Sequence, residues 1–129
     1  MFLTLYVISI PIFFLIDMLW LGLIAKNFYQ VRIGHLMEIS WLPAILFYFI
    51  FLVGLTYFAL YPAAQAGSLQ TALIAGALFG FFTYATYDLT NLATIRDWPL
   101  DMVIIDILWG TFLGGTVSVA TYYIYTLIQ

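Results

Sequence analysis

Two nearly identical pentapeptides, IDMLW at residues 16–20 and IDILW at residues 105–109, place an aspartate three positions before a tryptophan in apolar surroundings. A third acid, Asp88, has Asn91 at the same spacing. Residues i and i+3 lie on one face of a helix, so each acid shares its face with a side chain that donates hydrogen bonds. Carboxylates in an apolar segment carry protons, bind cations or pair with neighbouring helices, which makes these pairs the first candidates for chemistry.

The composition places these acids inside a membrane. The chain has 129 residues, of which 66% are hydrophobic and 7% are charged, and a soluble domain needs more polar surface than that. Crossing a bilayer takes about 20 apolar residues in a helix. The sequence therefore predicts a single domain, residues 1–129, with four spans at about 2–25, 41–61, 69–95 and 100–127. Since only helices or closed barrels satisfy the backbone in lipid, the expected fold is all-α, an antiparallel bundle of four transmembrane helices.

The connections between these spans are short, apart from residues 26–40. That segment has apolar residues at helical spacing, which is consistent with a short helix lying at the membrane interface, with a frayed loop as the alternative. Pro62 is expected to close the second span. Asp97 is a candidate N-cap for the fourth span.

Charge predicts an orientation and excludes one class of partner. The three basic residues, Lys26, Arg32 and Arg96, all lie in connections 26–40 and 96–101. The positive-inside rule therefore predicts that these connections are cytoplasmic and that both termini are outside. So few basic residues argue against a nucleic acid partner. With no cysteine, no disulfide, thiolate or iron–sulfur site is available, and no residue is assigned as a metal ligand.

The three intramembrane acids are expected to lie at one depth. Asp17 is nine residues before Lys26 and Asp88 is eight before Arg96, while Asp106 follows the short turn and lies six residues into the span predicted to begin at residue 100. At about 1.5 Å per residue, all three lie roughly 9–14 Å from the cytoplasmic ends of their helices. The sequence therefore predicts an acidic and aromatic pocket in the cytoplasmic half of the bundle. The candidate ligand-binding or proton-binding residues are Asp17, Trp20, Tyr84, Asp88, Asn91, Asp106 and Trp109.

Small residues recur at spacing four in the third and fourth spans: Gly76 and Gly80, then Gly110 and Gly114. Such rows let two membrane helices approach closely, and facing rows would bring Asp88 and Asp106 into one interface. No lysine or arginine lies within the spans to neutralise the acids. That leaves a proton, a metal ion or a cationic ligand, or a structural clasp in which the acids only accept hydrogen bonds.

Four segments carry a resemblance to a known family: IDMLWLG near the start, FYFIFLVGL in the second span, YDLTNLATIRDWP after the third, and DILWGT in the fourth. They look like an uncharacterised bacterial family of small membrane proteins, domain of unknown function 2177. The resemblance covers nearly the whole chain. It implies four transmembrane helices in the bacterial inner membrane, and it brings no activity, catalytic residue or cofactor with it.

Three classes of function follow from these observations. The first is a pocket that binds or processes a lipid-like or amphipathic molecule, although no H-E-x-x-H or G-x-S-x-G motif is present. The second is a transporter coupled to protons or cations, which intramembrane acids often mark. The third is an accessory subunit of a homo-oligomer or a larger membrane complex, with the acids as clasps. Replacing aspartate by asparagine separates them, because a clasp survives and proton or cation chemistry does not.

Overall fold

The computed structural model describes all 129 residues, and nearly all of them are helical. The helices are α1 (Phe2–Leu19), α2 (Lys26–Ile33), α3 (Trp41–Leu55), α4 (Tyr61–Ala66), α5 (Leu69–Thr94) and α6 (Leu100–Leu127). Short π-helical or 3₁₀ segments join several of them: Trp20–Ile24, Gly34–Leu36 and Thr56–Leu60. No strand is present.

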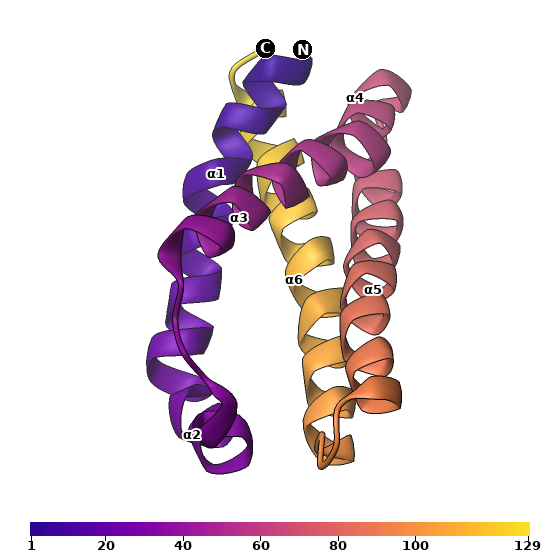
Figure 1. Cartoon of the computed structure of the whole chain (residues 1–129). Coiled ribbons are helices and arrows are strands. Elements are labelled where there is room, and N and C mark those ends of the chain that lie inside the picture. The colour runs from indigo at the N-terminus through magenta and orange to yellow at the C-terminus, as the bar shows by residue number, and fades with distance from the viewer.

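Four continuous helical segments are long and apolar enough to cross a membrane: Phe2–Ile24, Trp41–Ala66, Leu69–Thr94 and Leu100–Leu127. The predicted all-α bundle of four transmembrane helices is therefore confirmed. The two termini lie at one end of the bundle, and α2 and the α5–α6 turn lie at the other (Figure 1). The segment between the first two spans contains the helix α2, followed by a short 3₁₀ turn.

Helices α5 and α6 form the most extensive contact in the fold, because glycines face each other along it. A Cβ added at Gly80 would overlap the backbone of Gly110, and one added at Gly114 would overlap the carbonyl of Gly76. Without side chains at these positions the two backbones touch. In lipid the hydrophobic effect does not drive helices together, so close van der Waals packing of this kind stabilises the pair. The pair forms the rigid wall against which the rest of the bundle packs.

The prediction that Pro62 closes the second span is wrong. The helix continues past it to Gly67, which ends it in a left-handed conformation with φ of 60°. Pro62 is tolerated because it falls in the first turn of α4, just after the π-helical segment Thr56–Leu60 has shifted the hydrogen-bonding register. Ser68 then caps α5, accepting a 3.1 Å hydrogen bond from the backbone N–H of Thr71.

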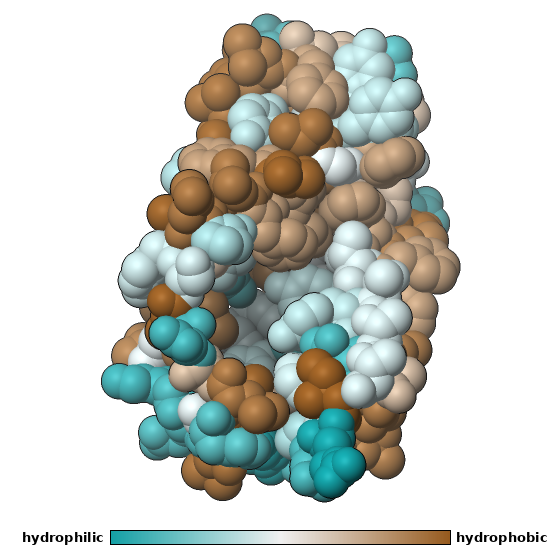
Figure 2. All heavy atoms as spheres, in the orientation of Figure 1, coloured by the Kyte–Doolittle hydropathy of each residue, from teal (hydrophilic) through white to brown (hydrophobic).

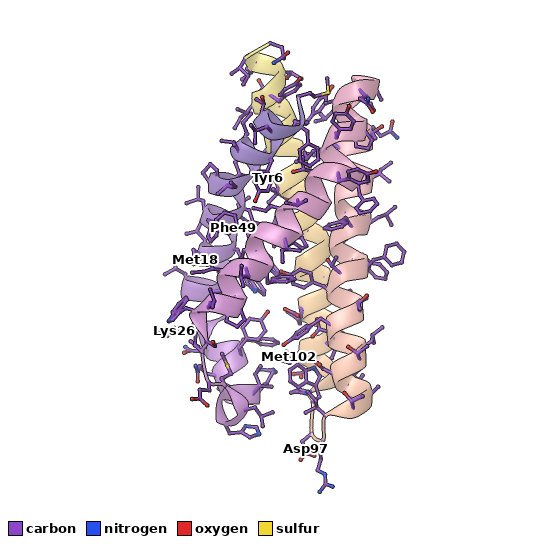
Figure 3. All side chains as sticks on the ribbon, turned by 45° about the horizontal axis from the view of Figure 1, so that its top comes forward. Tyr6, Met18, Lys26, Phe49, Asp97 and Met102 are labelled. Carbon is purple, nitrogen blue, oxygen red and sulfur yellow. The ribbon has the colours of Figure 1, made fainter.

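The prediction that Asp97 caps the fourth span is also wrong. Pro99 occupies the N-cap position of α6, and no side chain caps that helix. Asp97 instead lies at the tip of the turn between α5 and α6 with φ of 62° (Figure 3). Aspartate tolerates this left-handed conformation better than most residues do. Asp97 therefore contributes its left-handed backbone conformation to the tight turn, and its carboxylate does not cap α6.

Helix α3 crosses the bundle obliquely and packs well only over its second half (Figure 1). Phe51, Leu52 and Leu55 join Phe13 of α1 and Leu113 of α6 in the main apolar core. The first half of α3 is largely exposed along its length, as expected for a lipid-facing helix. The hydroxyl of Tyr6 donates a 3.4 Å hydrogen bond to the carbonyl of Phe49 and ties α1 to the middle of α3 (Figure 3).

Candidate acidic and aromatic cavity

A cavity of about 420 Å³ lies in the half of the bundle that contains α2 and the α5–α6 turn. One face of the molecule is visibly hollowed there (Figure 2). Carboxylates from three spans reach it: Asp17 of α1, Asp88 of α5 and Asp106 of α6. Their exposed fractions are 3%, 0% and 8%. Three acids far apart in sequence therefore converge on one cavity, each with little exposed surface.

Each acid is positioned by a regular row of small or apolar residues that faces the bundle interior. In α1 the buried residues at spacing four are Leu5, Ser9, Phe13 and Asp17. In α5 the buried row Ala72, Gly76 and Gly80 leads to Asp88. In α6, Asp106 precedes Gly110 and Gly114 on the same face. Because buried acids are costly in lipid, this inward placement is the physically acceptable one.

Asp106 is held by the short helix α2. The hydroxyl of Tyr29 donates a 2.5 Å hydrogen bond to Oδ1 of Asp106. The same hydroxyl accepts a 3.1 Å hydrogen bond from the indole Nε1 of Trp20. Burial, and after it the Asp106 carboxylate, raises the pKa of Tyr29, so this hydroxyl keeps its proton and remains a donor. Tyr29 was not among the candidate residues, and only its helical spacing within residues 26–40 hinted at it.

The two repeated pentapeptides meet through their tryptophans. The rings of Trp20 and Trp109 stack with centroids 4.3 Å apart and an interplanar angle of 6°. Asp17 lies near the indole of Trp109 and the hydroxyl of Tyr48 from α3. Such groups are able to donate hydrogen bonds to a carboxylate, but Nε1 of Trp109 is buried and makes no hydrogen bond in this structure. Tyr48 also escaped the sequence analysis, because its span is apolar on all sides and shows no inward face.

Asp88 differs from Asp106, which accepts from Tyr29, because nothing donates to it. Both of its carboxylate oxygens are fully buried and without a hydrogen-bond partner. Asp106 lies beside it, and like charges do not relieve each other. Asn91, one turn further along α5, does not line the cavity and lies near Tyr87 instead. Of the seven candidate residues, it alone is left outside.

Aromatic side chains form much of the remaining wall. Tyr84 packs its ring against Gly110, where any Cβ would overlap it. Tyr87 and Trp98 meet edge to face with centroids 6.1 Å apart. Phe47 and Tyr87 are 50% and 54% exposed, so they lie at the rim where the cavity opens. The lining is therefore acidic at its depth and aromatic toward its mouth.

An ion pair fastens α2 beside the cavity. Nε and Nη2 of Arg32 both bind Oδ2 of Asp101, at 2.8 and 2.7 Å. The Arg32 guanidinium also lies 3.8 Å from the centre of the Phe28 ring. Arg32 is thus paired with Asp101 outside the cavity, and no positively charged side chain lines the cavity. The acids are not grouped in a way that could hold a metal ion.

Comparison with known proteins identifies a family without an assigned activity. No curated protein sequence and no solved structure matches the chain. A family model described as a predicted membrane protein, domain of unknown function 2177, matches residues 2–123. The match covers the first three transmembrane helices, the fourth as far as residue 123, and every residue of the cavity. The chain therefore belongs to the predicted membrane protein family of domain of unknown function 2177.

Proposed function

We propose that this protein binds an amphipathic, lipid-like small molecule in the acidic and aromatic cavity. The observation that carries the proposal is the contrast within the cavity: 13 of its 17 lining residues are hydrophobic, yet three carboxylates converge at its depth. A volume of about 420 Å³ is within the range typical of small-molecule sites. An apolar chain fits the walls, and a polar head group fits the acids.

The position of the mouth supports a ligand that enters from the bilayer. The first half of α3 makes little contact with α5, and Phe47 and Tyr87 flank the opening between them. Both helices are transmembrane segments, so an opening between them faces lipid. An amphiphile dissolved in the membrane reaches such a mouth without crossing water, with its head group leading.

The lining favours binding over acyl transfer. It contains no serine, cysteine or histidine, so it lacks the nucleophile and base that hydrolases of the serine or cysteine type use. The acids are the reactive groups present. Tyr29 donates to Asp106 and accepts from the indole of Trp20, and Tyr48 lies beside Asp17. We therefore assign retention or presentation of a ligand, with no covalent step.

The cavity end of the bundle is proposed to face the cytoplasm of a bacterial cell. Lys26, Arg32 and Arg96 all lie at that end, and the positive-inside rule orients such ends inward. Because the chain has no cysteine, single cysteines can replace His35 and Gln129 in turn. A membrane-impermeant maleimide added to intact inner-membrane spheroplasts should label position 129 only. Labelling of position 35 alone would reverse the orientation.

Proton or cation transport is the second candidate, and one observation favours it. Ser118 and Thr121 of α6 are fully buried, and neither hydroxyl has a partner, so polar groups continue beyond Asp106 toward the other end. Leu113 and Val117, both fully buried in the main core, lie between Asp106 and these two hydroxyls along α6 and interrupt the series of polar groups. A pH-sensitive dye inside proteoliposomes tests it: transport predicts acidification that Asp106→Asn abolishes, whereas binding alone predicts none.

A fluorescence experiment tests binding directly. Three tryptophans line the cavity, and Trp41 does not, so Trp41→Phe serves as the background. Bromine quenches indoles at close range, and we expect saturable quenching when ω-bromododecanol and ω-bromododecylamine are titrated into nanodiscs of phosphatidylcholine. Ala44→Phe fills the cavity and should abolish saturation, while Ala93→Phe, exposed on α5, should not. Linear quenching by both probes, alike in all variants, would contradict a binding site.

A further inference from the structure

Asp88 lacks the donor side chains that lie beside the other two acids of the cavity. Asp106 accepts from Tyr29, and Asp17 has Tyr48 and Trp109 beside it. Asp88 is fully buried, lines the cavity, and has no donor on either oxygen. A buried acceptor without a donor is destabilising, so Asp88 either shares a proton with the neighbouring Asp106 or takes a donor from a molecule outside the chain.

The chain has no positive group available for that role. The charged side chains that line the cavity are Asp17, Asp88 and Asp106, all acidic. The nearby Arg32 is paired with Asp101, and Lys26 lies outside the cavity. The titratable groups that face Asp88 from other elements are Asp106 and Tyr29. Neither of them brings a positive charge.

We propose that the amphiphile bound here carries a protonated primary amine, whose N–H groups donate to the Asp88 carboxylate. The inference rests on the proposed function of the cavity and names the chemistry of its ligand. A primary ammonium offers three donors and therefore satisfies both oxygens, whereas a quaternary ammonium offers none. The faces of Tyr87 and Trp98 also favour a cation over a neutral head group.

Two sources supply this chemistry, a single-chain amine and an aminophospholipid such as phosphatidylethanolamine. Trp98 separates them. Its indole Nε1 is buried beside the cavity and has no acceptor. A phospholipid carries phosphate and ester oxygens close to its amine, and these could accept a hydrogen bond from that N–H, whereas a single-chain amine has no such oxygens. Trp98→Phe should therefore weaken binding of phosphatidylethanolamine more than that of a simple alkylamine, because phenylalanine keeps an aromatic face for the cation but has no N–H.

The head group is tested with three brominated probes of equal chain length on the Trp41→Phe background: ω-bromododecylamine, its trimethylammonium analogue and ω-bromododecanol. We expect the amine to bind roughly 10- to 100-fold more tightly than the other two, the range of one charge-assisted hydrogen bond. Asp88→Asn should remove that preference while keeping the binding of the alcohol, which also shows that the variant folds. Asp97→Asn, in the exposed turn, should behave as wild type.

Each other outcome is decisive. Equal binding of the three probes, unchanged by Asp88→Asn, would overturn the assignment of an amine head group while leaving a general amphiphile site. A preference for the trimethylammonium probe would overturn the hydrogen bond to Asp88 and favour recognition by the aromatic wall alone. Saturable binding of none of the probes would overturn the proposed function itself.

Discussion

The hydroxyl of Tyr29 lies 2.5 Å from Oδ1 of Asp106, joining residues 77 positions apart in the chain. Tyr29 belongs to α2, which is bounded by a π-helical segment before it and a 3₁₀ turn after it. Its fastenings to α6 are this bond and the ion pair from Arg32 to Asp101. Helix α2 is therefore a small cover, held against the cavity by side chains rather than by an extensive packed surface.

Tyr29→Phe should release α2. The change removes a donor from a mostly buried carboxylate, and a hydrogen bond to a charged group contributes about 1.5–3 kcal/mol. Trypsin should then cleave after Lys26 and Arg32 several-fold faster, while cleavage after Arg96, in the other turn, stays constant. Tyr57→Phe, on a residue 62% exposed, is the matched control. Unchanged cleavage in Tyr29→Phe would show that the hydroxyl does not hold the helix.

The ion pair should contribute a salt-dependent part of the same fastening. The Arg32 side chain is partly exposed and the Asp101 side chain is largely exposed, so added salt screens their attraction. Asp101→Asn should speed cleavage after Lys26 at low ionic strength, and the difference from wild type should shrink as salt is added. Asp97→Asn provides the comparison. A difference that persists at high salt would assign the effect to the hydrogen bond that Oδ1 of Asp101 accepts from the backbone N–H of Met102 rather than to the pair.

Alkaline pH should loosen α2 only well above the usual tyrosine range. Burial and the Asp106 carboxylate raise the pKa of docked Tyr29, above the value near 10 of a free tyrosine. The stabilisation is therefore complete below about pH 10 and is lost as pH rises through the raised pKa. Tyrosinate absorbance of wild type minus Tyr29→Phe should show no step near pH 10. A step there with the bundle still folded would contradict a docked hydroxyl.

Gly80→Ala should destabilise the whole bundle. A Cβ at this position overlaps the backbone of Gly110, and overpacking of this kind costs about 1–3 kcal/mol. Gly115→Ala is the matched control, because the nearest atoms to a Cβ there are side-chain atoms of Ala77 and Leu73 at 3.4 Å, an ordinary van der Waals distance. Thermal unfolding in detergent should show a lower midpoint for Gly80→Ala alone. Equal midpoints would mean that α5 and α6 are free to separate slightly at no cost.

The sequence predicted the helices well because their ends are marked locally. The fourth span, 100–127, has the predicted bounds, and the third ends one residue earlier than expected, at Thr94. Long apolar runs set the lengths, and polar turns separate them. Pro62 misled because its effect depends on the hydrogen-bond register of the preceding turn, which a π-helical segment altered. That register is not visible in residue types.

The cavity was only partly accessible to sequence reasoning. Depth alone indicated that Asp17, Asp88 and Asp106 would lie close together, since depth follows from helical rise. Rotation about each helix axis is harder to predict in an apolar helix, so Asn91 was assigned inward and Tyr48 was overlooked. Tyr29 depends on how α2 folds back on α6, a contact between distant segments that no periodicity encodes.

The most direct test of the central claim is native mass spectrometry of protein released gently from its own membrane. Wild type, Asp88→Asn and Asp97→Asn are compared at equal thermal stability. We expect one discrete amphiphile of defined mass on wild type and on Asp97→Asn, and its loss from Asp88→Asn. Only bulk lipid on all three proteins would contradict the account, and the three buried aspartates would then be clasps between helices.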